Sequence, residues 1–263
     1  MKHAPALFVS HGAPTFALDP GVLGPKLAHL GQQLPQLTAV AVVSAHWQTA
    51  GVEVLRTAQP ETIHDFRGFP PELYRLQYPA RGAPAQALET AAILEAAGIE
   101  AGFDAERGID HGVWVPLLYL LPSAQVPVDQ VSLPFSCDAR SALALGRALA
   151  PLRRSGVLVM GSGSLTHNLG EIGRNDPGNS RYAVEFTAWI RTHVQRRDIE
   201  ALVDYRRRAP HAERAHPSEE HFLPLLVALG ASDAADVVTV IEGGMTYGVL
   251  SMESYAFANA ASH

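Results

Sequence analysis

The chain has 263 residues, 47% of them hydrophobic and 17% charged, with a formal net charge of −6. This length can bury a large core, and α/β domains often reach about 250 residues as one unit, so we expect a single domain over residues 1–263. The acidic balance lacks the basic surface that nucleic acids and anionic membranes attract, and no apolar run approaches the roughly 20 residues of a membrane span.

Apolar runs bounded by turn residues predict buried strands, in chain order at 6–10, 38–45, 127–133, 156–161 and 236–242. Helical spacing predicts helices at 84–97, 138–153, 180–193 and 219–229. Residues 52–58 form a shorter candidate strand, and residues 244–257 predict a closing strand at the edge of the sheet. Strands that alternate with helices indicate an α/β fold with a largely parallel central sheet flanked by helices.

The stretch 59–81 is polar and proline-rich and has no regular period. A loop of that length in a compact domain is often a lid or a binding loop. Its aromatic residues suit a pocket for a small aromatic acid, and we expect substrate contacts from His64, Phe69 and Tyr74. A surface loop that packs its own aromatic side chains is the alternative.

Several histidines lie where an open α/β sheet binds its ligands, beyond the carboxyl ends of the strands. His11 follows the first strand, His46 follows the second, and His167 follows the strand at 156–161 through the turn GSGSLTH. His111 lies in a glycine-flanked turn, GIDHGVW, before an apolar helical stretch. A lone histidine after a strand is more often a cap or a core residue, so position alone leaves a ligand role open.

The stretch AHPSEEHF before the helix at 219–229 adds two more histidines. Pro217 suits the first turn of a helix, with His216 near its cap. Glu220 and His221 are adjacent and point about 100° apart on a helix, so one can ligate a metal while the other supports it or faces solvent. An ordinary amphipathic helix with an acidic first turn explains the same residues.

Six motifs follow one another along the chain: FVSHGAPT, VVSAHW, HDFRGFPPELY, DHGVWVPL, GSGSLTHNL and AHPSEEHFLPLLVALGA. In this order and spacing they resemble the class III extradiol aromatic-ring-opening dioxygenases, and in particular the group named 4,5-DOPA dioxygenase extradiol-like. The resemblance runs from about residue 6 to residue 257. It is specific for the family and not for a substrate.

The resemblance implies a role for each histidine. Three of them hold the metal, namely His11 in the HG motif, His46 in AHW and His221 in HPxxEH. In the wider class the third ligand is a glutamate, and His221 stands in its place. His167 in SLTH corresponds to the acid/base histidine, and His111 in DHG corresponds to a second catalytic histidine.

A metal held on one face by three protein ligands suits ring cleavage. It leaves positions for two catecholate oxygens and for O2, so we expect Fe(II) as the cofactor and a catechol, DOPA-like or related, as the substrate. A nearby histidine can take the protons that the catechol loses as it binds. His216 is expected to line the pocket or to support a ligand.

The residues also leave two other functions open. Three neutral ligands describe a catalytic zinc site as well, so a zinc-dependent hydrolase is one alternative. Zn(II) is an expected occupant of a purified sample, because such sites bind it more tightly than Fe(II). A non-catalytic metal-binding scaffold protein is the other alternative, since fold does not fix function. The two extra imidazoles of His111 and His167 favour a catalyst over a scaffold.

Composition also suggests where the chain works. Cys137 is the only cysteine, which excludes an intrachain disulfide and is typical of a reducing compartment. The opening residues MKHAPALFVSHG are interrupted too early for a signal peptide. We therefore expect a cytoplasmic monomer or homodimer that binds neither nucleic acid nor membranes.

Overall fold

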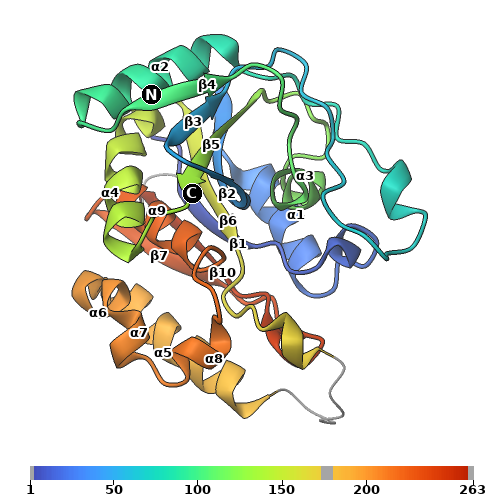
Figure 1. The fold of residues 1–263 in the computed structure, drawn as a ribbon, viewed down its shortest axis with the longest axis vertical. Helices are drawn as coiled ribbons and strands as arrows, with labels where there is room; N and C mark the ends of the chain where they lie inside the picture. Colours follow the sequence, from blue (N-terminus) through green and yellow to red (C-terminus); the bar gives the residue numbers. More distant parts are fainter. Residues whose placement is uncertain (1–2, 173–179, 260–263) are drawn as a thin grey trace.

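The computed structural model describes residues 3–172 and 180–259, and an eight-stranded sheet runs through the middle of this part of the chain (Figure 1). In spatial order the strands are β4 (Ala101–Asp104), β3 (Val52–Leu55), β5 (Val128–Pro134), β2 (Ala39–Thr49), β6 (Val157–Gly163), β1 (Ala6–Ser10), β10 (Ser254–Asn259) and β7 (Asp236–Ile241). The pairs β1–β6, β6–β2, β2–β5 and β3–β4 are parallel, whereas β3–β5, β1–β10 and β10–β7 are antiparallel. The expected α/β fold with a mostly parallel sheet is confirmed.

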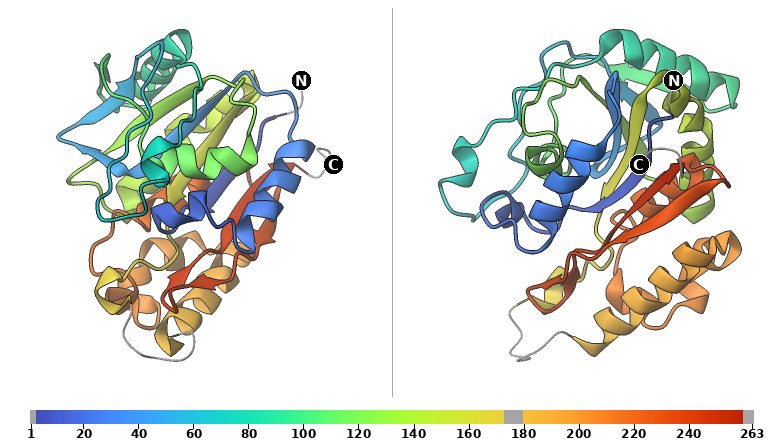
Figure 2. Two further views of the ribbon diagram at one scale, coloured as in Figure 1. Left: turned by 90° about the vertical axis from the view of Figure 1, so that its right-hand side faces the viewer. Right: turned by 180° about the vertical axis from the view of Figure 1, so that it is seen from behind.

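Helices cover both faces of the sheet (Figures 1 and 2). One face carries α1 (Leu23–Gln33) and α3 (His111–Leu120), and the other carries α2 (Pro84–Ala96), α4 (Ala139–Leu149) and α9 (Leu223–Ala231). The remaining helices gather below α9 in Figure 1, and they are α5 (Arg181–Arg196), α6 (Ile199–Val203), α7 (Tyr205–Arg208) and α8 (Ala212–Ala215). No helix in the described ranges is both long and apolar enough to cross a membrane.

The unbroken apolar runs of the central strands follow from this layering. Successive side chains of a strand point to opposite faces, so a strand buried on both faces needs apolar residues throughout. In β1, Phe8 packs into the core beneath α4 and α9, while Leu7 and Val9 pack into the core beneath α1 and α3. Because β1, β6 and β2 are parallel, their carboxyl ends meet at one edge of the sheet.

The closing strand differs from its prediction. The region 244–257 divides into a small hairpin of β8 (Met245–Thr246) and β9 (Leu250–Ser251), followed by β10. β10 lies between β1 and β7 and is antiparallel to both, so the prediction of an edge strand was wrong. The first four residues of β10 are buried, whereas burial alternates along β7 and Val237 is 49% exposed, as expected of the true edge.

Two helix boundaries also differ from prediction, and both involve proline. The helix expected at 219–229 begins at Leu223, because Pro224 occupies its first turn and the residues before it form turns. The helix expected at 138–153 ends at Leu149 and continues as a 3-10 helix, Ala150–Ser155, with proline in its first turn. The strand β4 was not predicted from the sequence. It has four residues of mixed burial and no clear apolar pattern.

Candidate functional site

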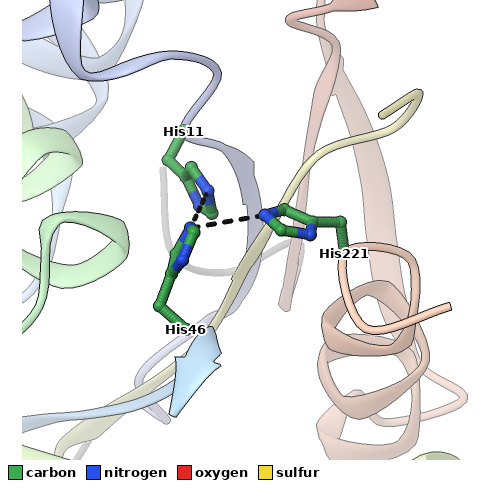
Figure 3. Close-up of side chains that lie close together, drawn as sticks. All are labelled: His11, His46 and His221. Atoms are coloured by element: carbon green, nitrogen blue, oxygen red, sulfur yellow. Dashed lines mark hydrogen bonds between the residues drawn. The ribbon is translucent and has the colours of Figure 1, made fainter. Parts of the chain in front are cut away.

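Three histidines from distant parts of the chain converge at the carboxyl edge of the sheet (Figure 3). The Nε2 atoms of His46 and His11 are 3.0 Å apart, and those of His221 and His46 are 3.3 Å apart. One nitrogen from each ring lies within 4.8 Å of the other two. The structure thus brings together the three residues that were expected to hold a metal.

Local backbone geometry explains how these histidines meet. His11 follows β1 directly, and the left-handed conformation of Gly12, at φ 61°, turns the chain away from the sheet. His46 lies in β2 where the pairing register with β5 shifts, which turns this part of the strand out of the regular ladder. His221 can lie against the end of β6 because Gly163 has no side chain. A Cβ atom at position 163 would collide with the carbonyl oxygen of His221.

The hydrogen bonds around His11 fix its tautomer. The single proton of the Ser162 hydroxyl is donated to the carbonyl oxygen of Gly112, so Ser162 Oγ must accept from its other neighbour. That neighbour is Nδ1 of His11, at 2.9 Å. His11 therefore carries its proton on Nδ1 and presents the lone pair of Nε2 to the cluster.

Carboxylates favour the same tautomer in the other two rings. Nδ1 of His221 lies 2.9 Å from Oε1 of Glu220, and Nδ1 of His46 lies 3.6 Å from Oδ2 of Asp65. An ionised carboxylate only accepts hydrogen bonds, so Nδ1 of His221 bears the proton and its Nε2 is unprotonated. The contact of His46 with Asp65 is too long for a hydrogen bond, but the negative charge of Asp65 favours the same tautomer. The unprotonated Nε2 atom of His46 thus lies 3.0 Å from that of His11 and 3.3 Å from that of His221, so lone pairs face one another and a cation among them would be stabilised.

The electrostatics favour the neutral form of all three rings. Burial and then the charges of neighbouring histidines lower the pKa of His11 and of His221 well below the usual value. Burial, followed by the charge of His111, lowers the pKa of His46 to about 4. Neutral imidazoles with free Nε2 atoms are the form in which histidine binds a metal, and three of them suit Zn(II) or Fe(II). The donor set therefore fits a metal ion.

His111 lies beside His46 at the first turn of α3. The two ring centroids are 4.0 Å apart, and the ring of His11 is 5.4 Å from that of His111. Nδ1 of His111 is 3.0 Å from Oδ1 of Asp65, and the same oxygen accepts a hydrogen bond from the backbone N–H of His111 at 2.9 Å. Burial opposes ionisation of Asp65, but the contacts with His111 outweigh it and lower the pKa to about 2.

His167 lies beside His221 on the loop after β6. The two rings stack with centroids 3.4 Å apart and planes 12° apart. The backbone N–H of His167 donates to the carbonyl oxygen of Ala215 at 2.8 Å, which fixes the loop. Burial is the main cause of a pKa near 4 for His167, so its ring is neutral at pH 7. Both histidines expected to be catalytic therefore border the convergent cluster.

The stretch 59–81 reaches the same edge of the sheet as His11. The ring of Phe66 faces the ring of His111, and the two centroids are 5.6 Å apart. Phe69 and Tyr74 pack against Phe66, with centroids at 5.4 and 5.2 Å. His64 packs against Trp114, and its Nε2 donates to the carbonyl oxygen of Leu76. The expected substrate contacts by His64, Phe69 and Tyr74 stay predictions.

His216 lies behind the loop that carries His167. Its side chain is fully buried against Phe186 and Phe222, and Nε2 donates to the carbonyl oxygen of Leu165 at 2.9 Å. Burial lowers its pKa to about 3. It is placed to support the loop, and a direct contact with substrate stays a prediction.

Two residues of the site were missed by sequence reasoning. Asp65 contacts the rings of His46 and His111, and Ser162 fixes the tautomer of His11. The signal for Asp65 was its place in HDF, between a histidine and a phenylalanine in the loop that was expected to line the pocket. Ser162 lies near the end of β6 in the glycine-serine stretch GSGS, whose two serines cannot be told apart from the sequence.

Comparisons with known proteins identify the family of the chain. The family described as the catalytic LigB subunit of aromatic ring-opening dioxygenase matches residues 3–258. The chain therefore belongs to the LigB family of aromatic ring-opening dioxygenases, and the resemblance drawn from the six motifs is confirmed.

Within that family the chain is similar to extradiol enzymes. A 4,5-DOPA dioxygenase extradiol of Beta vulgaris is 36% identical over 256 residues, which cover 96% of each chain. One of Escherichia coli (strain K12) is 37% identical over 255 residues, covering 95% of this chain and 93% of the relative. The crystal structure of an uncharacterized Escherichia coli K12 protein has a TM-score of 0.80 at 32% identity and covers 96% of this chain and 99% of that one.

Proposed function

We propose that the chain is a non-haem Fe(II)-dependent extradiol dioxygenase that opens the ring of a catechol with O2. The observation that carries the proposal is the convergence of three neutral Nε2 lone pairs, from His11, His46 and His221, beside two further imidazoles. Membership of the family supports the reaction class. The names of the Beta vulgaris and Escherichia coli relatives support a DOPA-like catechol.

In this proposal His11, His46 and His221 hold the metal through Nε2. Nδ1 of His11 is hydrogen-bonded to Ser162 and Nδ1 of His221 to Glu220, and Nδ1 of His46 faces Asp65 at 3.6 Å, so each ring has a partner that orients it before a metal binds. When bound, Fe(II) supplies the one-electron chemistry that allows an aromatic diol to react with O2. Three protein ligands leave room for the substrate oxygens.

His167 is the proposed base. Its ring is neutral at pH 7 and can accept a proton from a catechol hydroxyl. Glu220 supports the protonated form of His167, because its negative charge raises the pKa of that ring. His111 is the proposed second catalytic group, and its contacts with Asp65 hold the ring in place beside the substrate. We further propose that residues 59–81 form an aromatic wall that excludes water.

The zinc-dependent hydrolase is the second candidate, since a set of three imidazoles also suits Zn(II). The two candidates differ in their use of O2, because a dioxygenase consumes it and a hydrolase does not. A cytoplasmic location stays a prediction from the composition.

The test is O2 uptake by the purified chain loaded anaerobically with Fe(II), and separately with Zn(II), across a panel of aromatic diols. We expect uptake only with Fe(II), only with adjacent hydroxyls such as those of L-DOPA or 3,4-dihydroxybenzoate, and with one O2 per ring opened. A diol with its hydroxyls in meta positions is the matched control, because it cannot chelate the metal. Absence of uptake with every catechol, or equal turnover with Zn(II) and no O2, overturns the proposal.

A further inference from the structure

One carboxylate of the loop 59–81, Asp65, touches two imidazoles of the site at once. Its Oδ1 lies 3.0 Å from Nδ1 of His111, and its Oδ2 lies 3.6 Å from Nδ1 of His46. The rings of His46 and His111 are themselves neighbours, with centroids 4.0 Å apart and planes 45° apart. The side chain of Asp65 is 23% exposed, so these two contacts are partly sheltered from water.

We propose that Asp65 is a positioning residue that fixes the tautomer and spacing of His46 and His111 together. The inference rests on the proposed function, in which His46 is a ligand and His111 a catalytic group. The negative charge of Asp65 lies 3.0 Å from Nδ1 of His111 and 3.6 Å from Nδ1 of His46, and it favours a proton on each of these two atoms. His46 then has a free Nε2 for a metal, and His111 has a free Nε2 as an acceptor.

The same carboxylate also holds the helix on which His111 lies. The first residue of α3 is His111, and Asp110 before it forms no side-chain capping bond. Oδ1 of Asp65 accepts a hydrogen bond from the backbone N–H of His111 at 2.9 Å. A residue from outside the helix thus satisfies a free N–H group of the first turn, as an N-cap side chain would. Nearby, the indole N–H of Trp114 donates to the carbonyl oxygen of Ile63 at 2.9 Å, which ties α3 to the loop a second time.

Charge gives Asp65 a further effect on the site. Three neutral imidazoles bring no negative charge to a divalent cation, whereas the carboxylate ligand of a two-histidine set would bring one. Asp65 places a negative charge on the far side of the His46 imidazole, 3.6 Å from its Nδ1 atom. Carboxylates that accept from a ligand imidazole raise its basicity, and their loss typically costs about 10–100-fold in metal affinity or activity.

The test compares three variants of the full chain. Asp65→Asn keeps the size and the acceptor for the His111 backbone but offers an N–H where a ring N–H was bound. Asp65→Glu keeps the charge and tests rescue. Glu72→Gln is the matched control, because Glu72 is an exposed carboxylate on the same loop. Circular dichroism and thermal melting establish that each variant is folded.

Two readouts need no substrate. Zn(II) affinity is measured by competition with a chelator, and nitrogen-15 spectra of labelled histidine report the tautomer of each ring. We expect Asp65→Asn to weaken Zn(II) binding by about 10–100-fold, to move the proton of His46 or His111 to Nε2, and to lower kcat more than it raises KM. Asp65→Glu should recover part of the affinity, and Glu72→Gln should match the wild type.

The outcomes separate this inference from the proposed function. If the wild type binds Zn(II) but no catechol is opened, the function fails while the role of Asp65 is still decided by affinity and tautomer. If Asp65→Asn leaves both the affinity and the tautomers unchanged, Asp65 is not a positioning residue, whatever the enzyme does with catechols.

Discussion

The two flanks of the histidine cluster are built differently. On one flank, the rings of His46 and His111 both face the carboxylate of Asp65, which also accepts a hydrogen bond from the backbone N–H of His111. On the other flank, Glu220 holds His221, while His167 stacks face to face on His221. Across residues 3–172 and 180–259, no hydrogen bond is found for the ring of His167.

This difference indicates that the two flanks have different roles in the proposed reaction. A ring with a fixed tautomer keeps its position but is restricted in where it can take up a proton, whereas a ring free of hydrogen bonds can gain and lose one without breaking its surroundings. We infer that the His111 flank orients the reactants and that the His167 flank moves protons. The predictions below test this contrast, from the largest expected effect to the smallest.

Removal of a ligand should have the largest effect, and it should be the same on either flank. His221→Ala or His46→Ala leaves only two imidazoles, so we expect bound metal to fall from stoichiometric to background levels. Metal content after Fe(II) loading and desalting, measured by mass spectrometry, checks this. His29→Ala is the control, because His29 is exposed on α1. Retention of metal by either ligand variant would show that the cluster is not the metal site.

The contrast between flanks is sharpest in His167→Ala. We expect metal binding to persist and turnover to fall by about 10²–10⁴-fold, the usual contribution of general acid/base catalysis. Added imidazole should restore part of the turnover here but not in His111→Ala, because His111 acts through its fixed position. Steady-state O2 uptake and metal content together decide this. Undiminished turnover in His167→Ala would remove it from the mechanism, and equal metal loss would make it a ligand.

A smaller effect is expected from Glu220→Gln on the second flank. The amide still reaches Nδ1 of His221 but brings no charge, so we expect metal affinity to fall by about 10–100-fold. Glu219→Gln is the matched control, because the neighbouring carboxylate of Glu219 binds the hydroxyl of Tyr205 at 2.8 Å. Chelator competition measures both variants. Equal affinities for the two would contradict a role for Glu220 in support of the ligand.

The smallest effect concerns a buried carboxylate that faces no imidazole. Asp129 in β5 accepts a hydrogen bond from Thr90, and for its second oxygen the described chain offers no partner. Burial raises its pKa to about 7, the opposite direction from Asp65. The folded chain thus holds a proton that the unfolded chain releases between about pH 4 and pH 7. The contribution of Asp129 to the free energy of unfolding therefore falls as the pH rises from about 4 to about 7.

The variant Asp129→Asn removes this dependence. Relative to the wild type, its unfolding free energy should rise between pH 5 and pH 8 by an amount on the order of 1 kcal/mol. The comparison with the wild type cancels the contributions of the histidines, whose lowered pKa values act in the opposite direction. Urea unfolding at the two pH values measures it. A constant difference between the two proteins would mean that Asp129 is ionised throughout.

The fold could be predicted because it depends on short-range patterns, whereas the roles expected of the histidines came from the resemblance of the six motifs to a family. A strand buried on both faces must be apolar throughout, and a parallel sheet gathers its strand ends, so His11 and His46 were recognisable as neighbours. The place of β10 could not be predicted, because pairing with β1 is decided by packing between the two ends of the chain. Asp65 was missed for a related reason, since an irregular loop has no period that indicates which side chain faces inward.

The position of β1 has a consequence for how the protein is made. This first strand pairs with β6 on one side and with β10, the last strand, on the other. During synthesis His11 and His46 leave the ribosome long before His221, and the first strand has no neighbour in its final place until β6 has emerged. The nascent amino-terminal half therefore cannot assemble the full donor set. In the proposed function, a metal can therefore find all three imidazoles only after the segment that carries His221 has joined the fold.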